Sequence, residues 1–451
     1  MNTMTIKEIG AAVGFPIEDE AKIAVISTDS RDITPGCLFV ALRGENFDGH
    51  QYVSSALKQG AAFALVDTGD KGDPRLIFCK DTEQGFLDIA GYYRSKFSPK
   101  VVAVTGSVGK TTTKEMISAV LEAGFATLKN KGNLNNRVGL PKTLLELAEY
   151  HEAAVLEMGM NHFGEISDLS HRGKPDMAVI TNIGVCHIEF LGSREGILKA
   201  KMEIRDGMAP GSPLILCGDD DLLWAFQDEQ HPIITYGITN QQCNIIGRDI
   251  VEKGGETTFV LCCEGRELTV KIPTFGEHNV RNALAAYAVG KQFGMEDEAI
   301  VQALANYTPA GMRQRIVRHS GFTVVEDCYN CSPESLKAAA AAFASMECEG
   351  KKIFALGDML ELGSHTAQAH YECGLYAAQQ GIDAVYCFGP ASQNTCRGAQ
   401  EGGAPVARHF STKEEMAQAL VQQLTPGDIL WVKGSRGMAL EDVLSKIYKE
   451  R

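Results

Sequence analysis

The stretch VVAVTGSVGKTTTKEMISAV, residues 101–120, decides how the rest of this chain is interpreted. An apolar run, typical of a buried strand, ends at a loop with Gly106 and Gly109, and Lys110 and Thr111 follow where a helical pattern begins. Glycines let successive backbone N–H groups point inward around phosphate oxygens, and a helix N-terminus adds partial positive charge. The loop is therefore predicted to bind the β- and γ-phosphates of a nucleotide.

The spacing of the loop is a shortened form of the pattern G-x-x-x-x-G-K-[ST], because only two residues separate its glycines. In that pattern the lysine contacts the outer phosphates and the next hydroxyl binds Mg²⁺. A glycine-rich turn with an exposed lysine is the alternative, but the flanking strand and helix are the context that a phosphate loop requires. The residues expected to bind nucleotide here are Gly106, Ser107, Gly109, Lys110, Thr111 and Thr112.

Composition restricts the class of protein. The chain has 451 residues, of which 44% are hydrophobic, and a formal net charge of -14, which argues against a nucleic-acid partner. The N-terminus lacks a basic segment followed by an apolar one, and no run approaches the roughly 18 apolar residues that span a bilayer. We expect a cytoplasmic protein without membrane insertion. Its 13 cysteines are scattered, as small buried hydrophobes would be.

The pattern of strands and helices predicts an α/β protein of three domains. Residues 1–98 alternate short strands and helices, which indicates a small α/β unit. Residues 99–311 contain continuous apolar runs between helical segments, which favours a mainly parallel sheet covered on both faces. Residues 312–451 repeat a βαβ-type pattern and predict a Rossmann-like domain.

Two candidate metal ligands follow successive strands of the second block. Glu157 lies at the end of AAVLEMG, and His187 lies just past MAVITNIG. If the strand of Glu157 neighbours the one before the phosphate loop, its carboxylate lies close to that loop. Each alone is as well explained as an ordinary polar residue, but together they favour a metal site. Lys201, by itself an ordinary helical lysine, would be expected at the surface.

Motifs along nearly the whole chain resemble the Mur ligases, the ATP-dependent amide-bond ligases of peptidoglycan precursor synthesis. In the central block these are TGSVGKTTTKE, KGNLNNRVGLPKTLLEL, LEMGMNHFGEISDLS, ITNIGVCHIEFLGSREGILKAKMEI and FGEHNVRNALAA. The first block adds DSRDITPGCLFVALRGENFDGH, and the third adds RQRI, EDCYNCSPES, LGDMLELG and VKGSRGMALE. CYNCSPES and GDMLELG are typical of the branch that adds D-alanyl-D-alanine to UDP-N-acetylmuramoyl-tripeptide.

The resemblance implies ATP, one or two Mg²⁺ ions, an acyl-phosphate intermediate and roles for particular residues. The catalytic and metal positions are Lys110, Thr111, Glu157, His187 and Lys201. The further nucleotide contacts are Asn279, Asn282, Arg313, Asp327 and Asn330. The expected substrate contacts are Ser30, Arg31, Asp48 and His50 at the uridine-diphosphate end, Asn135 and Asn136, and Lys433, Ser435 and Arg436 on the acceptor side.

Lys201 matches a position that several Mur ligases carry as a carbamylated lysine, which binds a second magnesium. Carbamylation converts a cation into an anion; whether this lysine is modified is left open by the sequence. The chain departs from the branch where YNCSP replaces the common YNANP, at Cys331 and Ser332, and where Arg137 and Lys142 stand in NNRVGLPK. These departures bear on substrate contacts rather than on the reaction.

Two other functions stay open at this point. Another ligase of the superfamily, tripeptide-forming or folylpolyglutamate synthetase-like, would share the central block. A nucleotide-dependent switch or binding module would share only the loop. We expect a monomer, since no long apolar stripe or heptad stands out. The sequence identifies neither the third residue of the tripeptide nor the general base for the acceptor amine, for which histidines such as His365 are candidates.

Overall fold

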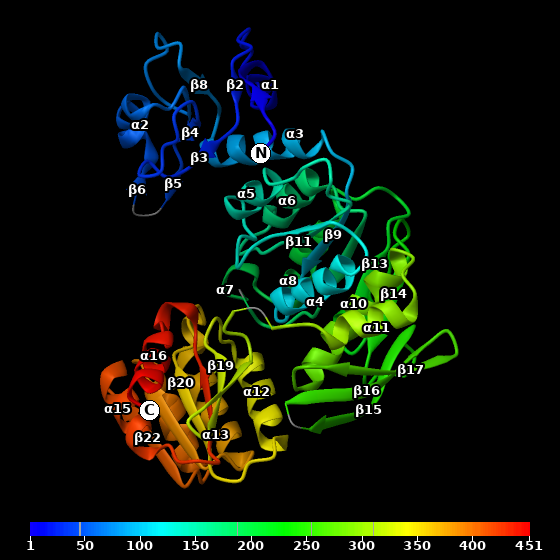
Figure 1. Ribbon diagram of the computed structural model, residues 1–451, viewed down its shortest axis with the longest axis vertical. Helices are drawn as coiled ribbons and strands as arrows, with labels where there is room; N and C mark the ends of the chain where they lie inside the picture. Colours follow the sequence, from blue (N-terminus) through cyan, green and yellow to red (C-terminus); the bar gives the residue numbers. More distant parts are fainter. Residues whose placement is uncertain (45–46, 187, 254, 310) are drawn as a thin grey trace.

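The computed structural model describes residues 1–44, 47–186, 188–253, 255–309 and 311–451. The chain forms three α/β bodies, each built on its own sheet, with the central body between the other two (Figure 1). The expectation of a three-domain α/β protein is therefore confirmed.

The N-terminal body is built on a four-stranded parallel sheet in the order β3-β4-β7-β8. Its long helix α3 packs against α5 and α6 of the central body and joins the two bodies. Its strands are β1 (Met4–Thr5), β2 (Lys22–Ile23), β3 (Ile26–Ser27), β4 (Leu38–Val40), β5 (Arg43–Gly44), β6 (Phe47–Asp48), β7 (Phe63–Val66) and β8 (Leu76–Phe78), and its helices are α1 (Ile6–Ala12), α2 (Val53–Gln59) and α3 (Thr82–Arg94).

The central body carries a nine-stranded sheet in the order β10-β11-β9-β12-β13-β14-β15-β16-β17. Its strands are β9 (Lys100–Thr105), β10 (Thr127–Lys129), β11 (Ala153–Glu157), β12 (Met177–Ile180), β13 (Leu214–Cys217), β14 (Ile233–Gly237), β15 (Ile245–Lys253), β16 (Glu256–Cys263) and β17 (Arg266–Ile272). Its helices are α4 (Lys110–Glu122), α5 (Gly139–Leu144), α6 (Glu165–Gly173), α7 (Ile188–Leu191), α8 (Arg194–Met202), α9 (Asp221–Ala225), α10 (Glu277–Gln292) and α11 (Asp297–Ala305).

The parallel part of this sheet positions the phosphate loop. Strand β9 is buried almost throughout and leads through residues 106–109 into α4. Strands β11 and β12 pair with β9 on its two sides, so the residues that follow all three strands meet at one edge. The condition set for Glu157, that its strand neighbours the phosphate-loop strand, is met, because β11 pairs with β9. His187 itself lies outside the described residues.

The far edge of the central sheet is antiparallel, which the sequence pattern did not indicate. Strands β15, β16 and β17 form a meander. Buried and half-buried residues alternate along β16, as expected for an antiparallel strand with one covered face. The prediction of a mainly parallel sheet holds for β9 to β15.

The C-terminal body has a six-stranded sheet in the order β18-β19-β23-β20-β21-β22, parallel except for the β18–β19 pair. Its strands are β18 (Arg315–His319), β19 (Phe322–Asp327), β20 (Lys352–Gly357), β21 (Ala384–Phe388), β22 (Val406–Phe410) and β23 (Ile429–Lys433). Its helices are α12 (Pro333–Ser345), α13 (Thr366–Gln379), α14 (Ser392–Glu401), α15 (Lys413–Gln423) and α16 (Glu441–Glu450).

Apolar side chains from both faces of each sheet form the cores. Trp431 at the centre of β23 is fully buried and contacts Phe343 and Phe354 at ring distances of 5.4 and 6.1 Å.

Across the described ranges, no helix has both the length and the apolar character required to cross a bilayer.

Candidate active site

A cavity of about 760 Å³ opens between the central and C-terminal bodies. Most of the predicted nucleotide, metal and acceptor residues line it, although they come from positions more than 300 residues apart in the chain. These are Ser107, Gly109, Lys110, Thr111, Thr112, Asn135, Asn136, Glu157, Lys201, Asn279, Asn282, Arg313, Asp327, Asn330, Lys433, Ser435 and Arg436.

The phosphate loop has the backbone that phosphate binding requires. Gly106 and Gly109 have φ values of 149° and 87°, and a Cβ at Gly106 would collide with the Thr181 hydroxyl. Lys110 Nζ donates to the carbonyl oxygens of Gly106 and Ser107, at 2.8 and 3.2 Å, so the lysine folds over the loop. A phosphate could replace these carbonyl contacts without displacing a core side chain.

Asn182, two residues after β12, braces the same loop. Its Oδ1 accepts from the backbone N–H of Val108 at 2.9 Å, its amide donates to the Val108 carbonyl at 3.0 Å, and its own carbonyl accepts from Ser107 N–H. The Ser107 hydroxyl accepts in turn from the Gly184 N–H at 2.8 Å. The loop conformation is therefore set by the strand that leads toward the second candidate metal ligand.

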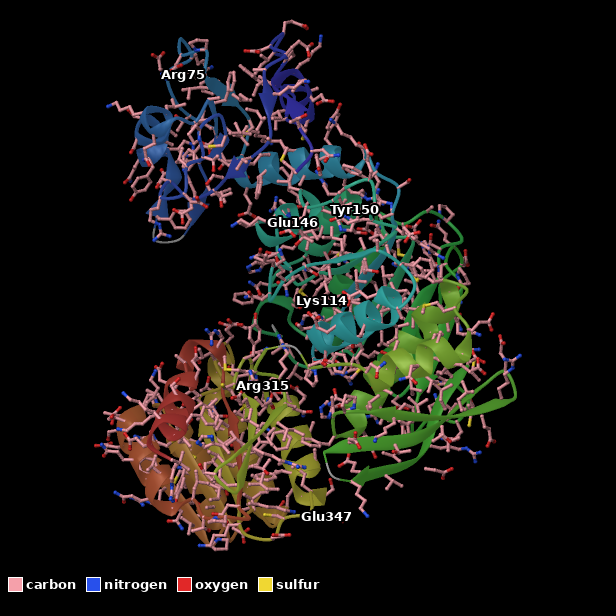
Figure 2. All side chains as sticks on the ribbon, viewed as in Figure 1. Arg75, Lys114, Glu146, Tyr150, Arg315 and Glu347 are labelled. Carbon is pink, nitrogen blue, oxygen red and sulfur yellow. The ribbon has the colours of Figure 1, made fainter. Side chains whose placement is uncertain are left out.

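Glu157 is 1% exposed and accepts from donors on two sides. The Thr111 hydroxyl donates to its Oε2 at 2.8 Å, and Asn135 Nδ2 donates to its Oε1 at 2.8 Å. Lys114, labelled in Figure 2, is fully buried on α4. Its Nζ lies 3.8 Å from Oε2 of Glu157. Asn130 holds the Glu157 backbone through two further hydrogen bonds. The carboxylate thus joins the nucleotide helix to the loop that carries the predicted substrate asparagines.

The donor set beside the phosphate loop suits magnesium. Mg²⁺ takes oxygen ligands, with one or two carboxylates completed by water and substrate phosphates. The Thr111 hydroxyl and the Glu157 carboxylate meet that requirement, since they already lie 2.8 Å apart. Among the described residues, no three His, Cys, Asp or Glu side chains cluster as a metal cage.

The expectation that Lys201 lies at the surface is wrong. Its side chain is 2% exposed and lines the cavity from α8. Burial lowers the pKa of Lys201 well below its ordinary value, and the nearby Lys110 adds to that shift. The apolar half of α8, with Ile197 and Ala200, packs inward and draws the lysine with it.

A chain of buried amides connects the central body to the start of the C-terminal one. Gln314 has an unusual positive φ of 56°, and its side chain accepts from Asn279 Nδ2 at 2.8 Å. The other end of the Gln314 amide lies 3.0 Å from His278 Nε2. Asn282 donates to Asn279 and accepts from the Thr113 hydroxyl of α4. The linker between bodies is thereby connected to the nucleotide helix.

Lys433 and Asp327 form a buried ion pair on the C-terminal side of the cavity. Lys433 Nζ lies 2.9 Å from Asp327 Oδ2, which also accepts from Trp431 Nε1 at 3.2 Å. Burial opposes the charge of Lys433, but the neighbouring Asp327 more than offsets it, and the pKa of Lys433 is raised. Lys433 Nζ also donates to the Asn330 carbonyl at 3.3 Å.

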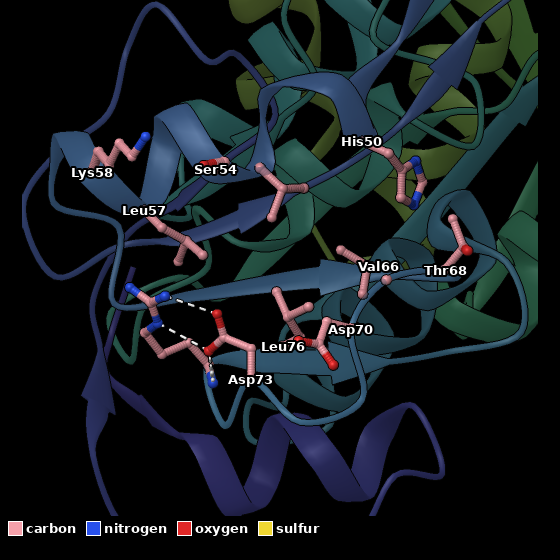
Figure 3. A pocket seen from close by; sticks show the side chains of 12 residues that line it. His50, Ser54, Leu57, Lys58, Val66, Thr68, Asp70, Asp73 and Leu76 are labelled. Carbon is pink, nitrogen blue, oxygen red and sulfur yellow. Dashed lines mark hydrogen bonds and ion pairs between the residues drawn. The ribbon is translucent and has the colours of Figure 1, made fainter.

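The four predicted residues of the uridine-diphosphate end lie in the N-terminal body, away from this cavity. His50 Nδ1 lies 2.7 Å from Asp48 Oδ1, and Arg31 pairs with Asp29. The backbone carbonyl of Ser30 accepts from Gln59 at 3.4 Å. A second cavity, of about 330 Å³, lies between α2 and the loop after β7, with His50 at one end (Figure 3).

Gly106 is not among the lining residues of either cavity, although its carbonyl accepts a hydrogen bond from Lys110.

Sequence reasoning missed several residues of the large cavity. Four of them line it: Asn182, His278, Gln314 and Glu334. The fifth, Lys114, lies behind the lining, beside Glu157. Lys114 lies one turn after Lys110 on the same helix, so helical spacing could have identified it. Asn182 lies two residues after a buried strand, and Glu157 ends one. Gln314 and Glu334 carry no such signal, because only the arrangement of the bodies brings them to the cavity.

Comparison with known proteins shows which family shares these features. Models of three parts of one family match in order: "Mur ligase family, catalytic domain" over residues 22–92, "Mur ligase middle domain" over residues 104–290, and "Mur ligase, glutamate ligase domain" over residues 312–436.

Individual relatives match over nearly their full length. The UDP-N-acetylmuramoyl-tripeptide--D-alanyl-D-alanine ligase of Bacillus subtilis is 39% identical over 98% of both chains. The Escherichia coli protein of the same name is 34% identical over 93% of this chain and 92% of its own. Among solved structures, MurF from Acinetobacter baumannii aligns with a TM-score of 0.90 at 31% identity, covering 100% of this chain and 99% of that one. MurF of Thermotoga maritima in complex with ADP aligns with a TM-score of 0.86 at 28% identity, covering 94% of this chain and 97% of that one.

Proposed function

The chain belongs to the Mur ligase family, and from that premise we propose that it joins D-alanyl-D-alanine to UDP-N-acetylmuramoyl-tripeptide in an ATP-dependent step of peptidoglycan precursor synthesis. The observation that carries this proposal is the full-length similarity to ligases of that name, at 39% and 34% identity. Solved ligases with other substrates, such as a folylpolyglutamate synthase at 17% identity, share the fold alone.

The chemistry begins with a carboxylate that does not react with an amine in water, because its oxygen is a poor leaving group. Attack of the terminal carboxylate of the tripeptide on the γ-phosphorus of ATP would give an acyl phosphate and ADP. The amine of D-alanyl-D-alanine would then attack the acyl carbon and release phosphate. Phosphoryl transfer requires positioning and charge neutralisation more than covalent chemistry. Lys110, already folded over the phosphate loop, would supply positive charge to the outer phosphates.

Thr111 and Glu157 would hold a magnesium ion beside the phosphates, with His187 as the further candidate ligand. When bound, the metal supplies charge neutralisation to the transferring phosphoryl group. Lys201 can serve a second ion only after conversion to a carbamate. Its lowered pKa favours the neutral amine, which is the form that reacts with CO₂. A ¹³C carbamate signal in protein equilibrated with ¹³CO₂, lost in Lys201→Ala, would support this modification, and its absence would refute it.

The other cavity residues divide between the nucleotide and the acceptor. We assign Asn279, Asn282, Arg313, Asp327 and Asn330 to ATP, and Lys433, Ser435 and Arg436 to the carboxylate end of D-alanyl-D-alanine. Asn135 and Asn136 would contact the peptide of the UDP substrate. Ser30, Arg31, Asp48 and His50 would bind its uridine-diphosphate end. Closure of the bodies would exclude water, which otherwise hydrolyses an acyl phosphate.

We propose that the protein is cytoplasmic, since both ATP and the nucleotide-linked substrate belong to that compartment. We also propose that it is a monomer, because no long apolar stripe or heptad stands out in the sequence. Size-exclusion chromatography with light scattering would test the monomer; a dimer mass at micromolar concentration would refute it.

The reaction is tested with purified protein, ATP, magnesium and the UDP-tripeptide against a panel of acceptors. Phosphate release that depends on D-alanyl-D-alanine supports the proposal. Release with glutamate or a diamino acid instead would favour another Mur-type or folylpolyglutamate reaction. Slow turnover that ignores every acceptor would favour a nucleotide-dependent switch.

A further inference from the structure

Glu334 has a carboxylate oxygen whose burial nothing so far explains. The residue lies in the first turn of α12, in the C-terminal body, and lines the large cavity. Its Oε2 is buried and has no hydrogen-bond partner within the described part of the chain. Its Oε1 accepts only a long hydrogen bond, 3.4 Å, from the backbone N–H of Val185. An unpaired buried carboxylate oxygen is costly, so it points to a ligand that completes it.

The carboxylate of Glu334 reaches across the cavity to the phosphate loop. A Cβ placed on Gly184 would lie 3.2 Å from Ser107 Cβ and 3.6 Å from Glu334 Oε1. A single methyl group would therefore fill the space between the Glu334 carboxylate and the Ser107 side chain. The carbonyl of Ser107 accepts a hydrogen bond from Lys110. An anion this close to the outer phosphates is unfavourable unless a cation or a proton lies between them.

Other carboxylates of the cavity already have partners. Glu157 accepts from Thr111 and Asn135, and Asp327 pairs with Lys433. Asp220 accepts from three backbone N–H groups, and Glu165 accepts from the Asn161 N–H. Glu361 is exposed. Of the described carboxylates that line the cavity, Glu334 is the one that combines a buried oxygen with the lack of a partner.

Capping of α12 does not account for Glu334, although a carboxylate in the first turn interacts favourably with the helix dipole. Ser332 and Ser335 already form a reciprocal cap at this N-terminus, and Pro333 occupies the first helical position. His278, which lines the cavity, is also unsuitable as a base, because burial lowers its pKa to about 4 and its Nε2 contacts Gln314.

We infer that Glu334 is a further catalytic residue, which binds the amine of the acceptor dipeptide and accepts the proton that this amine loses on attack. The inference rests on the proposed ligase function and supplies its missing general base. Glu334 belongs to the same body as Lys433 and Arg436, which are assigned to the other end of the dipeptide. An acceptor held by both would direct its amine toward the phosphate loop, where the acyl phosphate forms.

The proton balance of the step is as follows. The acceptor ammonium loses one proton to solvent and becomes a neutral amine. Its nitrogen lone pair forms the C–N bond at the acyl carbon, and the C–O bond to phosphate breaks with its electron pair leaving on phosphate. The nitrogen, now cationic, passes its second proton to Glu334 Oε2, which returns it to solvent.

The test compares two acceptors in Glu334→Gln, Glu334→Asp and the matched control Glu347→Gln, an exposed glutamate just beyond α12 (Figure 2). Hydroxylamine is uncharged at neutral pH and traps acyl phosphates as hydroxamates, so it has little need of a base. We expect Glu334→Gln to lower kcat/KM for D-alanyl-D-alanine about 100-fold while hydroxamate formation and the Mg²⁺ requirement stay unchanged. Glu334→Asp should recover part of the loss.

Three results would overturn this inference alone: an equal loss with both acceptors, no loss with either, or a shifted Mg²⁺ requirement, which would make Glu334 a metal ligand. A wild-type protein that forms neither ADP nor hydroxamate from the UDP-tripeptide would instead overturn the proposed function, and the inference with it.

Discussion

The hydroxyl of Thr111 donates a 2.8 Å hydrogen bond to Oε2 of Glu157, and this contact joins the phosphate loop to the adjacent strand β11. Asn135 and Lys114 approach the same carboxylate, so each neighbour named here is a donor or a cation. The arrangement surrounds a buried carboxylate with donors beside the place where phosphates would bind.

Replacing Glu157 with glutamine should remove the negative charge. It also turns one carboxylate oxygen, which accepts a hydrogen bond, into an amide nitrogen that faces a donor, Thr111 or Asn135. We expect kcat to fall about 100-fold or more, as for loss of one preorganised electrostatic contact, and the Mg²⁺ concentration for half-maximal activity to rise. Isothermal titration with Mg·ATP measures the binding part. Glu146→Gln, at an exposed ion pair with Lys131, is the control. Unchanged Mg²⁺ dependence would contradict the assigned role.

Lys114 should matter for stability as well as for substrate binding. Its Nζ is fully buried, donates to the Asn130 carbonyl at 2.7 Å and lies 3.1 Å from Glu115. Lys114→Met leaves the buried Glu157 without its cation and Glu115 with Lys129 alone, which should cost about 3–5 kcal/mol of unfolding free energy. Urea denaturation measures this cost, and Lys131→Met, in an exposed ion pair after β10, serves as control. A cost equal to the control would show that the ion pairs contribute nothing.

Gln314 should couple nucleotide affinity to the placement of the C-terminal body. Gln314→Leu leaves the amide of Asn279 and the ring of His278 without this partner, at a cost of about 1–3 kcal/mol. We expect KM for ATP to rise more than KM for D-alanyl-D-alanine. Steady-state kinetics separates the two, and Gln302→Leu on the exposed face of α11 serves as control. Equal changes in both constants would argue against a nucleotide-linked role.

His278 should make stability depend on pH in a defined window. Burial lowers its pKa from 6.5 to about 4, with Asp327 opposing the shift, so the folded protein holds the neutral ring. The unfolded chain binds a proton below pH 6.5 and the folded chain does not, so the stabilisation is complete above that pH and is lost as the pH falls toward 4. The loss is at most about 3 kcal/mol. The difference in unfolding free energy between wild type and His278→Gln should shrink across this window; a constant difference would contradict it.

Local patterns predicted the phosphate loop well because strand, loop and helix are contiguous there. Glu157 could be placed because the ends of neighbouring parallel strands share one edge. Lys201 was misjudged as exposed, since its burial depends on how α8 lies against the cavity, which helical spacing does not reveal. Gln314 and Glu334 could not be identified from the sequence, because only the arrangement of the two bodies brings them to the cavity. The antiparallel meander β15–β17 was not predicted, because the apolar runs that indicate strands are interrupted there.

The central claim is that the terminal phosphoryl group of ATP passes to the carboxylate of the tripeptide before the amide bond forms. The most direct measurement labels that carboxylate with ¹⁸O and follows the phosphate released during ligation by mass spectrometry. The account predicts one ¹⁸O atom in each phosphate formed. Phosphate without label, produced alongside the amide product, would contradict it.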